Sequence, residues 1–219
     1  MLRANVLRLF TFAASLFMSS ANAAGVVTPF SSSAYAENAN TKGVILVSAN
    51  WARKWGCGRF ENAQLKSLSF DRAGALKTGN DAKADFVLED TSIFPAASRF
   101  VNYAYIAEPG EYLLSGFLVK RVLLASDISY AHAGRTTLIQ DGRSKAGSFT
   151  VSAGEIVYIG HFFLDCYQEP IPWRYYTRDK ASFSEFLSDI KGEFGALDVT
   201  KAKFRLFDTE ILGKAFVLQ

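Results

Sequence analysis

Residues 149–163 read FTVSAGEIVYIGHFF, and their pattern sets the architecture expected for this chain. Two apolar runs, rich in β-branched and aromatic residues, flank a short break and predict a β-hairpin with a tight turn at Gly154. The second run divides between two strand faces, with Ile156, Tyr158 and Phe162 expected on one and Val157, Ile159 and Phe163 on the other. Because both faces are apolar, we expect this strand to be covered on both sides.

Other apolar segments predict further strands and one helix. Runs bounded by Gly, Pro, Asn and Asp predict strands at 43–52, 65–70, 85–89, 100–106 and 112–119. Near the C-terminus, helical spacing relates Phe183, Phe186, Leu187, Ile190 and Phe194. This spacing predicts an amphipathic helix over residues 182–194. The expected fold is mostly β, an antiparallel β-sandwich with this helix packed on it.

The first 23 residues have the three parts of a secretory signal peptide. Arg3 and Arg8 are basic, residues 9–18 are apolar, and residues 21–23 read Ala-Asn-Ala. The apolar run is far shorter than the roughly 20 residues of a membrane-spanning helix. We therefore expect an exported mature chain with no transmembrane segment.

Domain boundaries follow from composition. Residues 24–42 are rich in Ser, Ala and Asn without periodicity and predict a flexible leader. Residues 43–219 are expected to form a single domain. The chain has 24 Lys and Arg against 21 Asp and Glu, and removing the signal peptide leaves 22 against 21. A nearly neutral chain without basic runs argues against nucleic-acid binding.

The chain has two cysteines, Cys57 and Cys166. A small even number of cysteines in an exported protein favours a disulfide. The bridge would close a loop of about 110 residues and stabilise the fold by about 4–5 kcal/mol. The alternative is a pair of free, buried thiols.

Residues with catalytic or metal-binding side chains are few. His161, Asp165 and Cys166 lie close in sequence but match no known metal-ligand spacing. Cys166 with His161 or His132 is a candidate nucleophile pair, although no thiol-hydrolase signature surrounds it and a disulfide would remove the thiol. We therefore predict no catalytic residue, metal or cofactor, and a thiol- or metal-dependent hydrolase remains an alternative.

Aromatic residues follow Pro170 and Pro172 as Trp173, Arg174, Tyr175 and Tyr176. Such side chains can form a platform for a sugar ring or a partner protein. The segment is therefore a possible binding surface, with peptidoglycan or another carbohydrate as the ligand class. Packing of the same side chains against a sheet edge or the helix is the alternative.

Two motifs carry a resemblance to a known family. They are PGEY at residues 109–112 and VSAGEIVYIG at residues 151–160. The chain resembles uncharacterised exported proteins and lipoproteins of Gram-negative bacteria, which are similar to transthyretin-like, or carboxypeptidase-regulatory-like, sandwiches. The resemblance covers mainly residues 100–165 and implies a fold without catalytic residues.

Together these observations predict a non-enzymatic β-sandwich with a binding or structural role in the bacterial envelope. We expect it in the periplasm or outside a Gram-negative cell, with an envelope partner or ligand that the sequence does not identify.

Overall fold

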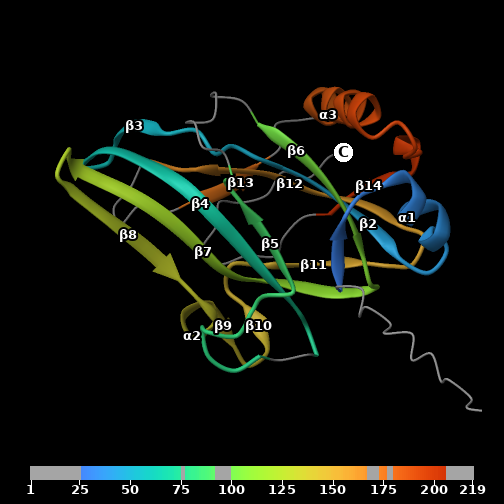
Figure 1. Cartoon of the computed structure of the whole chain (residues 1–219), viewed down its shortest axis with the longest axis horizontal. Coiled ribbons are helices and arrows are strands. Elements are labelled where there is room, and N and C mark those ends of the chain that lie inside the picture. Colours follow the sequence, from blue (N-terminus) through green and yellow to red (C-terminus); the bar gives the residue numbers. More distant parts are fainter. Residues whose placement is uncertain (1–25, 75–76, 92–99, 167–172, 177–179, 206–219) are drawn as a thin grey trace, which may run out of the picture.

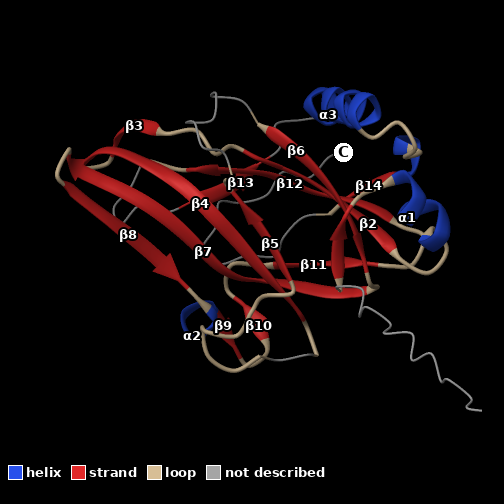
Figure 2. Cartoon of the chain, viewed as in Figure 1, coloured by secondary structure: helices blue, strands red, loops and turns tan. Residues whose placement is uncertain are grey.

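The structure is a computed structural model that describes residues 26–74, 77–91, 100–166, 173–176 and 180–205. For residues 173–176 and 180–182 it describes the backbone only. The predicted signal peptide lies outside the described residues. Most of the regular structure is β-strand, which confirms a mostly β fold (Figures 1 and 2). None of the described helices is long and apolar enough to cross a membrane.

Sheet A has the strand order β1-β6-β2-β12-β13, and β14 also pairs with β12. Its strands are β1 (Val27–Pro29), β2 (Gly43–Ala49), β6 (Val101–Ala107), β12 (Ile156–Leu164), β13 (Trp173–Tyr176) and β14 (Ala202–Phe204). Strand β12 pairs in parallel with β2 and β14. The expectation of a purely antiparallel fold is therefore wrong for the centre of sheet A.

Sheet B has the strand order β11-β7-β4-β3, with β5 beside β4 and β8 beside β7. Its strands are β3 (Lys54–Cys57), β4 (Phe60–Arg72), β5 (Phe86–Glu89), β7 (Gly110–Leu124), β8 (Asp127–Ala133) and β11 (Ser148–Val151). A small hairpin joins β9 (Ile139–Gln140) to β10 (Arg143–Ser144). All described pairings in sheet B are antiparallel.

The described helices are α1 (Ser32–Asn38), α2 (Arg135–Leu138), α3 (Lys180–Glu193) and the 3₁₀ turn η1 (Val199–Lys201). Helix α3 is the predicted C-terminal helix, beginning two residues earlier and ending one residue earlier than expected. Phe186 and Ile190 of α3 belong to a buried cluster with Leu46 and Tyr158 of sheet A.

Within the expected flexible leader, residues 24–42, the described part begins at residue 26 and contains β1 and α1. Strand β1 extends sheet A by pairing with β6, and the Ser31 hydroxyl caps α1 by accepting a hydrogen bond from Ala34 N at 3.3 Å. The Phe30 ring lies 5.5 Å from Tyr35 and 5.6 Å from Phe194. Composition alone missed this structure because the pairing of β1 with β6 and the contact of Phe30 with Phe194 are made with residues distant in sequence.

The stretch at residues 149–163 forms two strands, but they are not a hairpin. Strand β11 pairs with β7 in sheet B, whereas β12 pairs with β2 in sheet A. The chain therefore passes from one sheet to the other at residues 152–155. Gly154 has the positive φ, 71°, that the sequence predicts for this turn.

A bulge at Gly160 changes the faces of β12. The pairing with β2 shifts between Tyr158 and His161, and Gly160 has a φ of 115°. One extra residue reverses the alternation of side chains beyond it. Phe162 therefore joins Val157 in the cluster shared by both sheets, and the prediction that it shares a face with Tyr158 is wrong.

A second crossing lies beside the first. Strand β6 of sheet A ends at Ala107, and β7 of sheet B begins at Gly110. Ala107 pairs with Gly43 in sheet A, and Gly110 pairs with Val151 in sheet B. The two crossings therefore form one corner of the fold, which includes parts of the PGEY and VSAGEIVYIG segments.

The two sheets share a large buried cluster. Sheet A contributes Ile45, Val47 and Ile159, among others, and sheet B contributes Leu65 and Phe70. Cys57 and Cys166 form the predicted disulfide, and Cys57 is fully buried in this cluster. Because Cys57 ends β3 and Cys166 follows β12, the bridge joins sheet B to sheet A at the end opposite the corner.

The corner predicts a steric role for Gly43. A Cβ there would overlap Val151 Cγ2 and approach Ser152 O to 2.6 Å. We expect Gly43→Ala to lower the free energy of unfolding by about 1–3 kcal/mol, measured by urea denaturation. Gly192→Ala is the control, because a Cβ there meets nothing within 4 Å, and it should leave stability unchanged or raised. Equal stability of the Gly43→Ala protein and the wild type would contradict this account.

Candidate functional site

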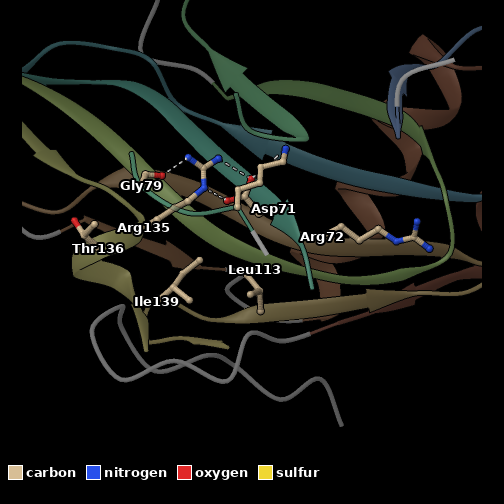
Figure 3. Close-up of a pocket in the computed structure, with 8 residues that line it drawn as sticks. Asp71, Arg72, Gly79, Leu113, Arg135, Thr136 and Ile139 are labelled. Atoms are coloured by element: carbon tan, nitrogen blue, oxygen red, sulfur yellow. Dashed lines mark hydrogen bonds and ion pairs between the residues drawn. The ribbon is translucent and has the colours of Figure 1, made fainter. Parts of the chain in front are cut away.

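A hollow with several charged residues in its lining lies on sheet B beside α2. Its volume is about 150 Å³, and its lining includes Asp71, Arg72, Lys77, Leu113, Arg135 and Ile139 (Figure 3). Strand β4 supplies Asp71, β7 supplies Leu113, and α2 begins with Arg135. The hollow thus lies where the chain between β4 and β5 meets α2.

Arg135 and Asp71 form a buried ion pair, with 8% and 3% of each residue exposed. Arg135 donates from Nε to Asp71 Oδ2 and from Nη2 to Asp71 Oδ1, the latter at 2.9 Å. Its Nη1 donates to the carbonyl oxygens of Gly79 at 3.2 Å and Ala82 at 2.6 Å. One guanidinium therefore fixes the chain between β4 and β5 to the sheet.

The pair shifts the titration of both partners. Burial raises the pKa of Asp71, but hydrogen bonds from Arg135 and Ser115 outweigh it, so this pKa lies below its ordinary value. The hydrogen bond to Asp71 is the largest influence on Arg135 and raises its pKa. Both groups therefore stay charged at neutral pH.

The other cations of this hollow also make internal contacts. Lys77 Nζ donates to Lys83 O at 2.6 Å and to Asp85 Oδ1 at 2.8 Å. Arg72 Nη2 donates to Pro109 O, and its side chain points away from the ion pair in Figure 3. The arrangement is that of a loop anchor, because each cation already holds a carbonyl or carboxylate of the chain.

His132 lines a neighbouring hollow of about 250 Å³ with Ser69, Ser115 and Gly116. Among the described residues, no group of three or more His, Cys, Asp or Glu side chains could hold a metal ion. The structure gives His132 no cysteine partner, since both cysteines are in the disulfide.

His161, Asp165 and Cys166, the residues of the alternative hydrolase site, do not form a thiol site in the oxidised protein. The Cys166 sulfur is bonded to Cys57, so the oxidised protein has no thiolate there. His161 lies among aromatic rings, with Nδ1 hydrogen-bonded to Tyr158 Oη and the Phe186 ring 5.3 Å away. Its surroundings are those of a strand histidine packed beside a helix.

The aromatic segment Trp173–Tyr176 is strand β13, and its backbone pairs with β12. The side chains of Trp173, Arg174, Tyr175 and Tyr176 lie outside the described part of the structure. Their role as a possible binding surface therefore stays a prediction.

Sequence reasoning missed an exposed apolar group on sheet B. The exposed fraction is 64% for Trp55 and Leu124, 57% for Tyr130 and 50% for Ile128. The strands predicted from the sequence include neither β3 nor β8. Alternation of apolar and small or polar residues in 127–133 was the available signal for β8.

Comparisons with known proteins found no match to this chain. No protein-family model, no curated protein and no solved structure matches the chain. The resemblance to transthyretin-like exported proteins therefore stays a prediction.

The ion pair predicts a large effect of Arg135→Met. The variant leaves Asp71 buried without its main partner, and we expect the free energy of unfolding to fall by about 3–5 kcal/mol in urea denaturation. Arg143→Met, at an exposed position in β10, is the matched control and should change it by less than about 0.5 kcal/mol. The double variant Asp71→Asn, Arg135→Met should recover part of the loss.

The pH dependence gives the same prediction a second readout. Because the folded pKa of Asp71 is lowered, its stabilisation is complete above the ordinary value of 3.8 and is lost as pH falls through the folded pKa. This acid-dependent loss should be smaller in the double variant. Two results together would show that the anchor does not stabilise the fold. They are a wild-type dependence of the free energy of unfolding on acid pH in the double variant, and a stability of Arg135→Met close to that of the wild type.

Proposed function

We propose that the chain is an exported, non-enzymatic β-sandwich protein that binds a component of the Gram-negative envelope. The observation that carries this proposal is the Cys57–Cys166 disulfide, buried in the cluster that both sheets share. Persistent structural disulfides are typical of oxidising compartments such as the periplasm. The signal-like residues 1–23 support the same location.

The sandwich assignment rests on the shared cluster. In this proposal sheets A and B are two layers of a single domain within residues 43–219, with β1 and α1 added before it. Helix α3 covers the outer face of sheet A through Phe186, whose ring lies 4.4 Å from that of Tyr158. In this arrangement both apolar faces of β12 are covered, one by sheet B and the other by α3.

A binding role fits the distribution of side chains better than catalysis does. The charged groups of the hollow beside α2 hold the chain itself, as described for Arg135 and Lys77. Trp55, Ile128 and Tyr130 instead project exposed apolar surface from sheet B. Exposed apolar groups of this kind mark interaction surfaces.

Fractionation of a Gram-negative host tests the proposal directly. We expect the full chain to be cleaved near Ala23, to appear in the periplasm with no free thiol, and to sediment in part with the envelope. Mass spectrometry, thiol labelling and immunoblots of the fractions measure these outcomes. A chain lacking residues 2–23 is the control and should remain cytoplasmic. An uncleaved, cytoplasmic full-length chain would overturn the proposal.

The disulfide should contribute much of the stability. Replacing both cysteines in a Cys57→Ala, Cys166→Ala variant should lower the free energy of unfolding by about 4–5 kcal/mol, because the bridge closes a long loop. Denaturation curves with and without reductant provide the measurement. Reductant should destabilise the wild type similarly and leave the double variant unchanged.

A further inference from the structure

Two turns lie together at one end of sheet B. The turn between β3 and β4 and the turn between β7 and β8 meet at the left of Figure 1. Their proximity follows from the register, in which Trp55 pairs with Asn62, Asn62 with Val122, and Val122 with Ile128. We call residues 53–61 and 120–128 the basic tip.

The basic tip presents apolar side chains to solvent. Trp55 and Ile128 lie in one cross-strand row, so their side chains are on the same face of the sheet. Leu124 at the turn is 64% exposed, and its neighbour Leu123 is 38% exposed. Trp55 of β3 and the two Leu at the end of β7 therefore give this end of sheet B a group of exposed apolar side chains.

Cations lie at the same end of sheet B as these apolar groups, on both faces of the sheet. Lys120 pairs with the exposed Tyr130, whereas Arg121 pairs with Ala63 of the buried cluster. The basic tip contains Arg53, Lys54, Arg59, Lys120 and Arg121 against the carboxylates of Glu61 and Asp127. The Arg53 guanidinium lies 5.4 Å from the centre of the Trp55 ring, and those of Arg59 and Arg121 lie 5.1 and 5.0 Å from Phe60. After removal of the signal peptide the chain has 22 cations and 21 acids, so the rest of it is net negative.

We infer that the basic tip docks on a bilayer surface rich in anionic phospholipid. Trp and Leu insert at the boundary between headgroups and acyl chains, while Arg and Lys keep their charges among the headgroups. The uneven charge orients the molecule with this end toward a negative surface. This inference rests on the proposed envelope function and names its partner.

Charge also decides between this occupant and a second copy of the chain. Two copies meeting tip to tip would bring the excess cations of each together, which is unfavourable. An anionic bilayer neutralises the same charges and accepts Trp55 and Leu124. The lipid surface therefore satisfies both the charge and the exposed apolar side chains.

Vesicle sedimentation of the exported, oxidised chain tests the inference. We expect binding to vesicles of phosphatidylglycerol and phosphatidylethanolamine, little binding to pure phosphatidylcholine, and weakening between about 0.05 and about 0.5 M NaCl. The variant Trp55→Ala, Leu124→Ser should bind about tenfold more weakly because it removes inserted apolar area. Arg53→Glu, Lys120→Glu should lose binding by a similar factor.

Two control variants change exposed side chains outside the basic tip. Val87→Ala removes a partly exposed apolar group from β5, and Arg143→Glu reverses an exposed charge in β10. Both should bind vesicles as the wild type does. Unchanged urea denaturation of the tip variants should show that they remain folded.

Three results would overturn the inference. They are absence of vesicle binding, equal binding by folded tip variants, and a lipid-free dimer in sedimentation velocity that the tip variants abolish. If the exported chain still sediments with the envelope in those cases, the proposed function stands and only the lipid partner is wrong. A chain that is never exported defeats the proposed function whatever the vesicles show.

Discussion

The corner at which the chain crosses twice between the sheets fixes the rest of the structure. Ala107 and Gly110 bound one crossing, and Val151 and Ile156 bound the other. Because Gly110 pairs with Val151 and Ala107 with Gly43, the register of both sheets is set at this one place. Gly43 permits the close approach, since any side chain there would meet the backbone of the second crossing.

Polar interactions near the corner hold the loops of sheet B in place. Arg135 joins α2, the chain before β5 and Asp71 of β4 through one buried guanidinium. A buried ion pair of this kind stabilises little beyond an apolar replacement, but it is costly to break and it specifies one loop arrangement. The charged residues of the hollow beside it are therefore explained by folding, whereas the exposed side chains of the basic tip are not.

The sequence allowed the strands and the disulfide to be predicted better than the pairing of the strands. The apolar run of β12 was readable because both faces need apolar neighbours, and the bridge was readable from the number of cysteines and the predicted compartment. Local periodicity does not specify which strand lies alongside, so the crossing at Gly154 looked like a hairpin. Gly160 inside the apolar run is a local signal for a bulge that the prediction did not use. The anchor at Arg135 has no such signal, because it depends on residues distant in sequence.

The disulfide closes residues 57–166 into a covalent ring that runs through both sheets and includes the corner. Cys57 and Cys166 are 109 residues apart in sequence, and the shared cluster lies largely within that interval. Tension applied to the two ends of the chain would pass directly from Cys57 to Cys166 through the bridge. Residues 58–165 would carry no load, so pulling could strip away the N-terminal strands and α3 while most of sheet B stayed folded.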